Sequence, residues 1–159
     1  MKRKPIRNIE KNTPVLMVKE KDMPYYNDVS FTTVASDDTQ HLISKSRNGI
    51  SMERIEQIMK RYHLTLKETA NILNISERTL QRYHDSDILT KDTTERALRL
   101  QRLYERGSIV FGTLSNFMSW MKSPVLIFSS EKPISFLDTI FGFEMLEDEL
   151  GKIEHGIFA

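Results

Sequence analysis

From Ile50 onward, the apolar side chains recur at the three- and four-residue spacing of amphipathic helices. The first such stretch places Ile55, Ile58, Met59 and Tyr62 on one face. Ser51 precedes it, and its hydroxyl can cap the helix. Helices of this kind bury their apolar stripe against one another. We therefore predict an all-α fold for the region after residue 50.

Capping residues, prolines and glycines divide this region into seven predicted helices. After the first, short helices are expected over residues 66–73 and 77–84. A long fourth helix, from about residue 93 to 110, begins at the capping box of Asp92 and Glu95. Its core stripe consists of Ala97, Leu100, Leu103 and Tyr104.

Three more helices are expected in the last fifty residues. Residues 111–121 form the fifth, and Pro124 ends it. Pro133 suits the first turn of a sixth helix, which Gly142 closes. The seventh runs from about residue 143 to 154, and Gly156 follows as a C-terminal stop.

The first 47 residues show no sustained period. Pro5, Pro14 and Pro24 interrupt them, and only residues 15–18, VLMV, could form a short strand. We interpret them as a loosely ordered N-terminal arm. The predicted domains are therefore the arm, residues 1–47, a middle domain, residues 48–106, and a C-terminal domain, residues 107–159.

Charge is distributed unevenly over these three segments. The arm carries nine basic and six acidic side chains, the middle domain eleven and nine, and the C-terminal domain three and seven. The first two could approach a polyanion, whereas the acidic last segment would be repelled by one. This asymmetry suggests two tasks, although surface charge can also drift along a chain without consequence.

Composition narrows the cellular context. The chain has no cysteine, which excludes disulfides and thiolate metal sites and favours a reducing compartment. No apolar run approaches the roughly 18 residues of a membrane span, and the basic start lacks the apolar segment of a signal peptide. We expect a soluble, cytoplasmic protein with no membrane partner.

Residues 66–83, LKETANILNISERTLQRY, have the spacing of a helix-turn-helix. Ala70 lies where the two helices would cross closely, and Leu73, Ile75 and Leu80 would fill the small core between them. Asn74 stands in the turn, where positive φ is required and glycine is usual, and asparagine tolerates that conformation. Ser76 would then cap the second helix, which is the helix that enters the major groove in this motif.

The side chains left outward on that second helix suit DNA. Arginine reads guanine and glutamine reads adenine, while small hydroxyls and lysine can contact phosphate. One such unit binds weakly, so a homodimer on a symmetric operator is expected. The alternative is an ordinary helical hairpin with a polar face. The predicted DNA-binding residues are Lys67, Ser76, Arg78, Thr79, Gln81 and Arg82.

Nothing in the sequence indicates an enzyme or a cofactor. The carboxylates of the last helix, Glu144 to Glu154, have only His155 nearby and are better explained as a solvated face than as a metal site. The other histidines have no ligand spacing, and no serine has a His–Asp framework around it. We therefore expect no catalytic residue, no metal and no cofactor.

Residues 132–159, KPISFLDTIFGFEMLEDELGKIEHGIFA, resemble the C-terminal toxin-binding domain of the Xre/MbcA/ParS antitoxins. The likeness rests on Pro133, Leu137-Asp138-Thr139, Gly142, Ile153-Glu154 and Gly156, with Trp120 and Pro124 matching upstream. Residues 66–83 resemble the Xre-type N-terminal domain of the same family. Lys152 stands where arginine is common in the family.

This resemblance implies a two-part function. Such antitoxins repress their own operon through the helix-turn-helix, and they inhibit a cognate toxin, usually a RES-domain protein that consumes NAD. Their C-terminal end lies at the toxin's active-site cleft. The toxin-binding residues would then be Lys152, Glu154, His155, Gly156, Ile157, Phe158 and Ala159.

The apolar terminus fits this interpretation, because Ile157 and Phe158 would be buried by the partner. They could instead fold back over the protein's own fifth and sixth helices. Two other functions also remain open. The chain could be a stand-alone regulator whose C-terminal domain dimerises or senses a ligand, or a protein-binding adaptor that does not bind DNA.

Overall fold

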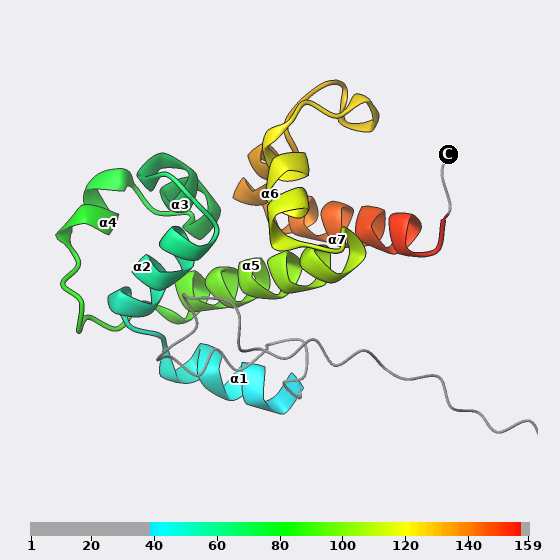
Figure 1. The fold of residues 1–159 in the computed structure, drawn as a ribbon. Helices are drawn as coiled ribbons and strands as arrows, with labels where there is room; N and C mark the ends of the chain where they lie inside the picture. Colours follow the sequence, from blue (N-terminus) through cyan, green and yellow to red (C-terminus); the bar gives the residue numbers. More distant parts are fainter. Residues whose placement is uncertain (1–38, 157–159) are drawn as a thin grey trace, which may run out of the picture. The chain divides into compact units, whose positions relative to one another are not determined.

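The structure is a computed structural model, and it describes residues 39–156 (Figure 1). Within this range it is all-helical, with isolated bridges between Ser51 and Ile88 and between Val125 and Glu131 in place of strands. The elements in chain order are α1 (Thr39–Asn48), α2 (Met52–Arg61), α3 (Leu66–Leu73), α4 (Glu77–Arg82), α5 (Lys91–Val110), α6 (Leu114–Lys122), the 3-10 helices η3 (Leu126–Phe128) and η4 (Pro133–Asp138), and α7 (Ile140–Glu154).

Helix α5 is the element around which the others pack. The helix-turn-helix elements lie along its first half, and α6 and α7 lie along its second half (Figure 1). The predicted stripe of Ala97, Leu100, Leu103 and Tyr104 is fully buried, which confirms the assignment of its inner face. The ring of Tyr104 stacks on that of Tyr62, the C-cap of α2, with centroids 4.2 Å apart, and meets Phe117 of α6 edge-on at 5.1 Å. One continuous core therefore includes residues from both predicted domains.

Helix α1 is a difference from the sequence-based expectation. Residues 39–47 were assigned to the loosely ordered arm, but they form a regular helix that packs against α5. Its apolar content is too low to give a clear periodic signal, and its one buried side chain is Ser46. The remainder of the arm, including the short strand expected at residues 15–18, lies outside the described residues.

The long helix begins slightly earlier than predicted. Thr90 caps α5, its hydroxyl accepting a hydrogen bond from the backbone N–H of Thr93, whereas Asp92 lies inside the first turn. Glu95, the predicted partner of the capping box, instead pairs with Arg99 at 3.6 Å. Threonine and aspartate are both good capping residues, so the sequence allowed either start.

The predicted sixth helix is also different. Residues 133–138 form the 3-10 helix η4, and Gly142 does not close it but lies in the first turn of α7, behind the cap Thr139. A Cβ atom on Gly142 would clash with the backbone carbonyl of Phe136. The glycine is therefore required by the close approach of α7 to η4, and not by a helix end.

Arg96 connects the two halves of the molecule. Its guanidinium, projecting from α5, donates to the backbone carbonyl of Ile72 in α3 at 3.3 Å and to that of Asp138 in η4 at 3.0 Å. Both carbonyls lie at the ends of short helices, where backbone acceptors lack partners within the helix. Among the described helices, none is both long enough and apolar enough to cross a membrane.

Candidate functional site

The turn between α3 and α4 has the conformation that the sequence predicted. Helix α3 begins at a capping box, in which Thr65 accepts from the backbone N–H of Glu68 at 3.2 Å and Glu68 accepts from that of Thr65 at 2.7 Å. Asn74 then adopts the left-handed conformation, with φ 55° and ψ 44°. The backbone N–H of Ile75 donates to the carbonyl of Ala70 at 3.0 Å, which completes the turn.

Helix α4 is anchored by one buried side chain and exposes the rest. Leu80 is fully buried, and Tyr83, just past the helix, is half-buried. At 100° per residue, Arg78 and Arg82 point almost directly away from Leu80, and both are exposed. These two arginines form the outermost part of the helix, as a groove-reading pair requires.

The other predicted DNA-binding residues flank this pair and are all exposed. Thr79 lies beside Arg82, Tyr83 and Asp87 around one shallow hollow. Gln81 lies on the opposite flank, in a hollow shared with Met59 and Leu66. Lys67 is on the first turn of α3. The six residues are thus exposed on α3, on α4 and at the turn between these helices.

Ser76 and Thr79 are engaged in the helix cap. The Ser76 hydroxyl accepts from the backbone N–H of Thr79 at 3.0 Å, and the two hydroxyls share a hydrogen bond of 2.7 Å. A hydroxyl can donate one hydrogen bond and accept two, so each retains some capacity for a further contact. Their first task is to hold the start of α4.

The predicted partner-binding residues lie at the end of α7, and two of them already have ionic partners. Glu154 accepts from Arg106 of α5 at 3.1 Å, and the same guanidinium donates to the backbone carbonyl of Glu147 at 3.1 Å. Lys152 pairs with Glu149 on its own helix at 3.1 Å. Arg106 thus holds the last turn of α7 against α5.

The helix ends where the sequence placed its stop. His155 is the C-cap, and its backbone N–H donates to the carbonyl of Gly151. Gly156 follows with φ +66°. Both residues are exposed. The last three predicted contact residues, Ile157, Phe158 and Ala159, lie outside the described residues.

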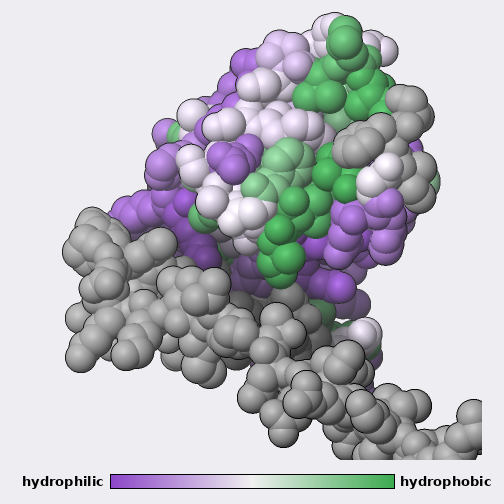
Figure 2. All heavy atoms as spheres, turned by 45° about the vertical axis from the view of Figure 1, so that its right-hand side comes forward, coloured by the Kyte–Doolittle hydropathy of each residue, from purple (hydrophilic) through white to green (hydrophobic). Residues whose placement is uncertain are grey.

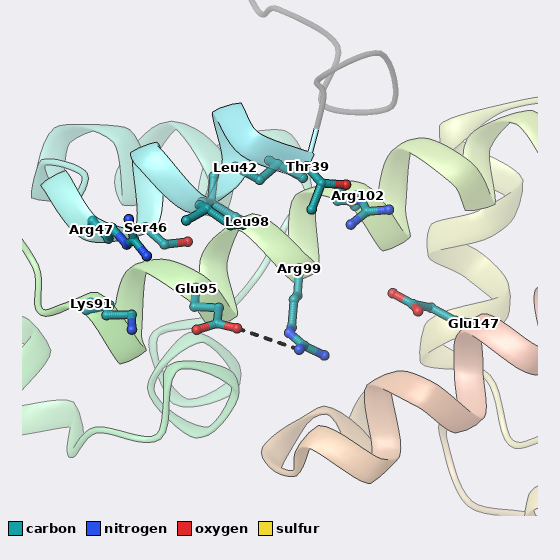
Figure 3. Close-up of a pocket in the computed structure, with 11 residues that line it drawn as sticks. Thr39, Leu42, Ser46, Arg47, Lys91, Glu95, Leu98, Arg99, Arg102 and Glu147 are labelled. Carbon is teal, nitrogen blue, oxygen red and sulfur yellow. Dashed lines mark ion pairs between the residues drawn. The ribbon is translucent and has the colours of Figure 1, made fainter.

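A hollow that the sequence did not predict lies between α1 and α5 (Figure 3). Its volume is about 500 Å³, and its lining combines Arg47, Lys91 and Arg102 with the Glu95–Arg99 pair. Glu147 of α7 lies across from them (Figure 3). It was missed because half of it comes from α1, which was assigned to the arm.

Among residues 39–156, no group of three or more histidine, aspartate or glutamate side chains could hold a metal ion. The carboxylates of α7 that face away from α5 are solvent-exposed at Glu144 and Asp148. Burial raises the pKa of the Tyr104 hydroxyl, but that group lies inside the aromatic core, away from either predicted site.

One group of exposed residues was not recognised from the sequence. Leu126 and Ile127 of η3 and Phe141 of α7 are 89%, 51% and 81% exposed. Ile127 and Phe141 line the same hollow. The signal was the apolar run VLIF between Pro124 and Ser129, which is too short for a helix that could bury all four side chains.

Comparison with known families matches both halves of the chain. Residues 41–102 match the antitoxin Xre-like helix-turn-helix domain, and residues 106–156 match the antitoxin Xre/MbcA/ParS C-terminal toxin-binding domain. Together the two matches cover more than two thirds of the chain.

Two similar proteins were found. The antitoxin Xre of Yersinia enterocolitica (serotype O:8, biotype 1B) is 27% identical over 121 residues, which cover 74% of this chain and 81% of the relative. A protein of Pyrococcus abyssi named as an HTH-type transcriptional regulatory protein is 33% identical over 72 residues, but these cover only 22% of its length.

The two domains occur in the order that the sequence analysis inferred, and the longer of the two likenesses is to an antitoxin over most of both chains. A stand-alone regulator is not favoured, because the C-terminal half matches a toxin-binding domain. The chain therefore has the two domains of an Xre-type antitoxin in sequence, a helix-turn-helix domain followed by a toxin-binding domain.

Proposed function

We propose that this antitoxin inhibits a cognate RES-domain toxin, which consumes NAD, by covering the toxin's active site with its C-terminal end. We further propose that it represses its own operon as a homodimer bound to operator DNA through α4. The observation that carries the proposal is the presence of two exposed, oppositely charged ends on one core. The arginines of α4 occupy one end, and the carboxylates of α7 occupy the other.

The end of α7 suits an active site that binds a dinucleotide. A cleft for a pyrophosphate needs positive potential, and the last turn of α7 presents the exposed carboxylate of Glu154. Arg106 fixes the last turn, so the helix end that precedes the tail lies at a defined point. A fixed starting point lowers the entropy that the tail loses when it binds.

The test for inhibition uses a chain that ends at Gly156. This truncation removes only Ile157, Phe158 and Ala159 and keeps the Glu154–Arg106 pair. A chain ending at Gly151 would lose the tail and the ion pair together. The proposed partner, a RES-domain toxin, is co-expressed with each chain, and growth and cellular NAD are measured. We expect the full chain to restore both, and the truncated chain to fail. Full protection by the truncated chain would refute the role of the tail.

The test for repression uses the two outward arginines. Arg78→Ala and Arg82→Ala should each weaken operator binding by about 1–3 kcal/mol if the side chains read bases, and leave the free energy of unfolding unchanged. Lys67→Ala should weaken binding to all DNA sequences alike and reduce the salt dependence, as expected for a phosphate contact. Affinities are measured by fluorescence anisotropy on the promoter fragment. Unchanged affinity in both arginine variants would exclude α4 as the reading helix.

A further inference from the structure

The exposed apolar residues of η3 and α7 form a second surface on the C-terminal domain. Ile127 and Phe128 of η3 face Phe141 and Met145 of α7 across a hollow of about 440 Å³. The rim on the α7 side is Glu144, Asp148, Glu149 and Lys152. Leu126 precedes Ile127 in η3 and is 89% exposed. We call this set the η3–α7 surface.

The surface exposes large apolar side chains to solvent. Hydrophobic residues gather at the top of the molecule in Figure 2, the level at which the loop containing η3 lies in Figure 1. Single exposed apolar side chains are common on soluble proteins, but a contiguous group with a polar rim marks an interaction site. Leu126 and Phe141 are both more than four-fifths exposed, so their burial would contribute to binding.

The charge of the rim is the second observation. Lys152 is paired with Glu149, which leaves Glu144 and Asp148 without an ion pair to any described residue. The rim therefore carries net negative charge that is open to a partner. DNA and anionic lipid would be repelled by it. A second copy in a two-fold contact would bring the same carboxylates together, because each copy presents the same patch.

The surface is also continuous with the end of α7. Phe141, Met145, Asp148 and Lys152 follow one another at four- and three-residue steps, so they share one face of the helix. The next position on that face is His155, directly before the tail. A partner that holds the tail can therefore extend along this face without a break.

We propose that the η3–α7 surface is a docking site for the toxin, separate from the tail that enters the active site. The toxin would present apolar side chains to Leu126, Ile127 and Phe141, and basic side chains to Glu144 and Asp148. The inference rests on the function proposed above and deepens it. It divides toxin binding between an anchoring surface and an inhibiting tail.

The experiment measures affinity for a catalytically inactive variant of the proposed RES-domain partner by calorimetry. The test variant is the double substitution Leu126→Ser and Phe141→Ser, and the matched control is Ile88→Ser. Ile88 is likewise an apolar residue that is largely exposed, at 59%, but it lies between α4 and α5, away from the η3–α7 surface. All three side chains are exposed, so folding should be unaffected, which circular dichroism verifies.

We expect the double variant to weaken toxin binding at least thirtyfold, as for central residues of an interface, and Ile88→Ser to change it less than threefold. Glu144→Gln with Asp148→Asn should slow association and reduce its salt dependence. Amide exchange in residues 124–129 and 140–145 should slow when the toxin is added. Unchanged affinity in the double variant, or exchange that slows only after residue 150, would overturn the inference.

Other outcomes separate this inference from the proposed function. If the full chain binds and the chain ending at Gly156 loses inhibition, while the double variant binds normally, only the docking surface is refuted. If the full chain itself fails to bind, both proposals fall. A dimer that becomes a monomer in the double variant would assign the surface to a second copy and overturn the inference. In the free chain, residues 124–129 could be protected from exchange and lose that protection on truncation at Gly156. The η3–α7 surface would then be covered by the chain's own tail, and the inference would be overturned.

Discussion

Helices α4 and α7 both carry exposed residues that we propose contact a partner, but the two helices are held in place in different ways. The position of α4 depends on its immediate neighbours in sequence, because Asn74 provides the turn, Ser76 the cap and Leu80 the anchor. The position of α7 depends on contacts with other elements, because Gly142 lies against the carbonyl of Phe136 in η4 and Arg106 of the distant α5 holds its last turn. A locally determined helix can be inferred from a short motif, whereas a helix fixed by tertiary contacts cannot.

The largest effect should come from the close contact under α7. In Gly142→Ala the new Cβ would collide with the Phe136 backbone, so α7 or η4 must shift, and we expect a loss of about 3 kcal/mol in the free energy of unfolding. The matched control is Gly156→Ala, where the added Cβ would meet none of the described residues within 4 Å and only the positive φ opposes the change, at about 1 kcal/mol. Urea denaturation measures both. Equal losses would mean that α7 is not held by close packing.

The turn before α4 offers the next effect. Asn74→Val should cost about 2 kcal/mol, because a β-branched side chain is poorly tolerated at φ 55°, while Asn74→Gly should be neutral within about 0.5 kcal/mol. The free energy of unfolding is measured for both variants. If Asn74→Val had the same free energy of unfolding as the unaltered protein, the turn would not require the left-handed conformation. The position of α4 would then depend less on its neighbours in sequence.

A smaller effect is expected at the end of α7. Arg106→Met removes a hydrogen bond to the Glu147 carbonyl and a partly exposed ion pair with Glu154, which together should cost about 1 kcal/mol. Amide exchange should quicken selectively in residues 151–156. Arg99→Met, which breaks the i, i+4 pair with Glu95, should cost only about 0.3 kcal/mol. Unchanged exchange in the Arg106 variant would show that the last turn is held by other contacts.

The smallest effect concerns the contact between the two regions, which are the helix-turn-helix domain and the C-terminal domain. Lys122 of α6 lies 3.6 Å from Glu68 of α3 and also donates to the backbone carbonyl of His63. Since the pair is partly exposed, Lys122→Met should change the free energy of unfolding by about 0.5 kcal/mol. A double-mutant cycle with Glu68→Gln, which retains the capping role, isolates the pair. A coupling well above 1 kcal/mol would show that the two regions are joined more tightly than their surface contacts suggest.

The same contrast explains how much the sequence could predict. The all-α class, the conformation of Asn74, the Ser76 cap and the buried stripe of α5 were all predicted, because each depends on residues a few positions apart. The role of Gly142, the 3-10 form of η4 and the engagement of Glu154 by Arg106 were not, because each involves residues brought together by folding. Helix α1 was missed because it is mostly polar and exposed.

The site residues divide similarly. The exposure of Arg78 and Arg82 opposite Leu80 agrees with the predicted face of α4, and their contact with DNA stays a prediction. The domain limits at residues 47 and 106, the homodimer and the RES-domain partner stay predictions as well. The η3–α7 surface was overlooked because hydrophobic periodicity identifies residues that face a core, and a three-residue helix has too few positions to show which side chains are left outside.

Helix α5 contributes side chains to the core beneath both regions, and this has a thermodynamic consequence. If the two regions melt in one transition, any molecule that binds only the folded chain raises the melting temperature of the whole, by mass action. Operator DNA held at α4 would then slow hydrogen exchange in α7, and a toxin held at α7 would do the same for α3. The two ligands would communicate through shared stability, even if neither moves an atom at the other's site. A calorimetric scan that resolved two separate transitions would show that they are independent.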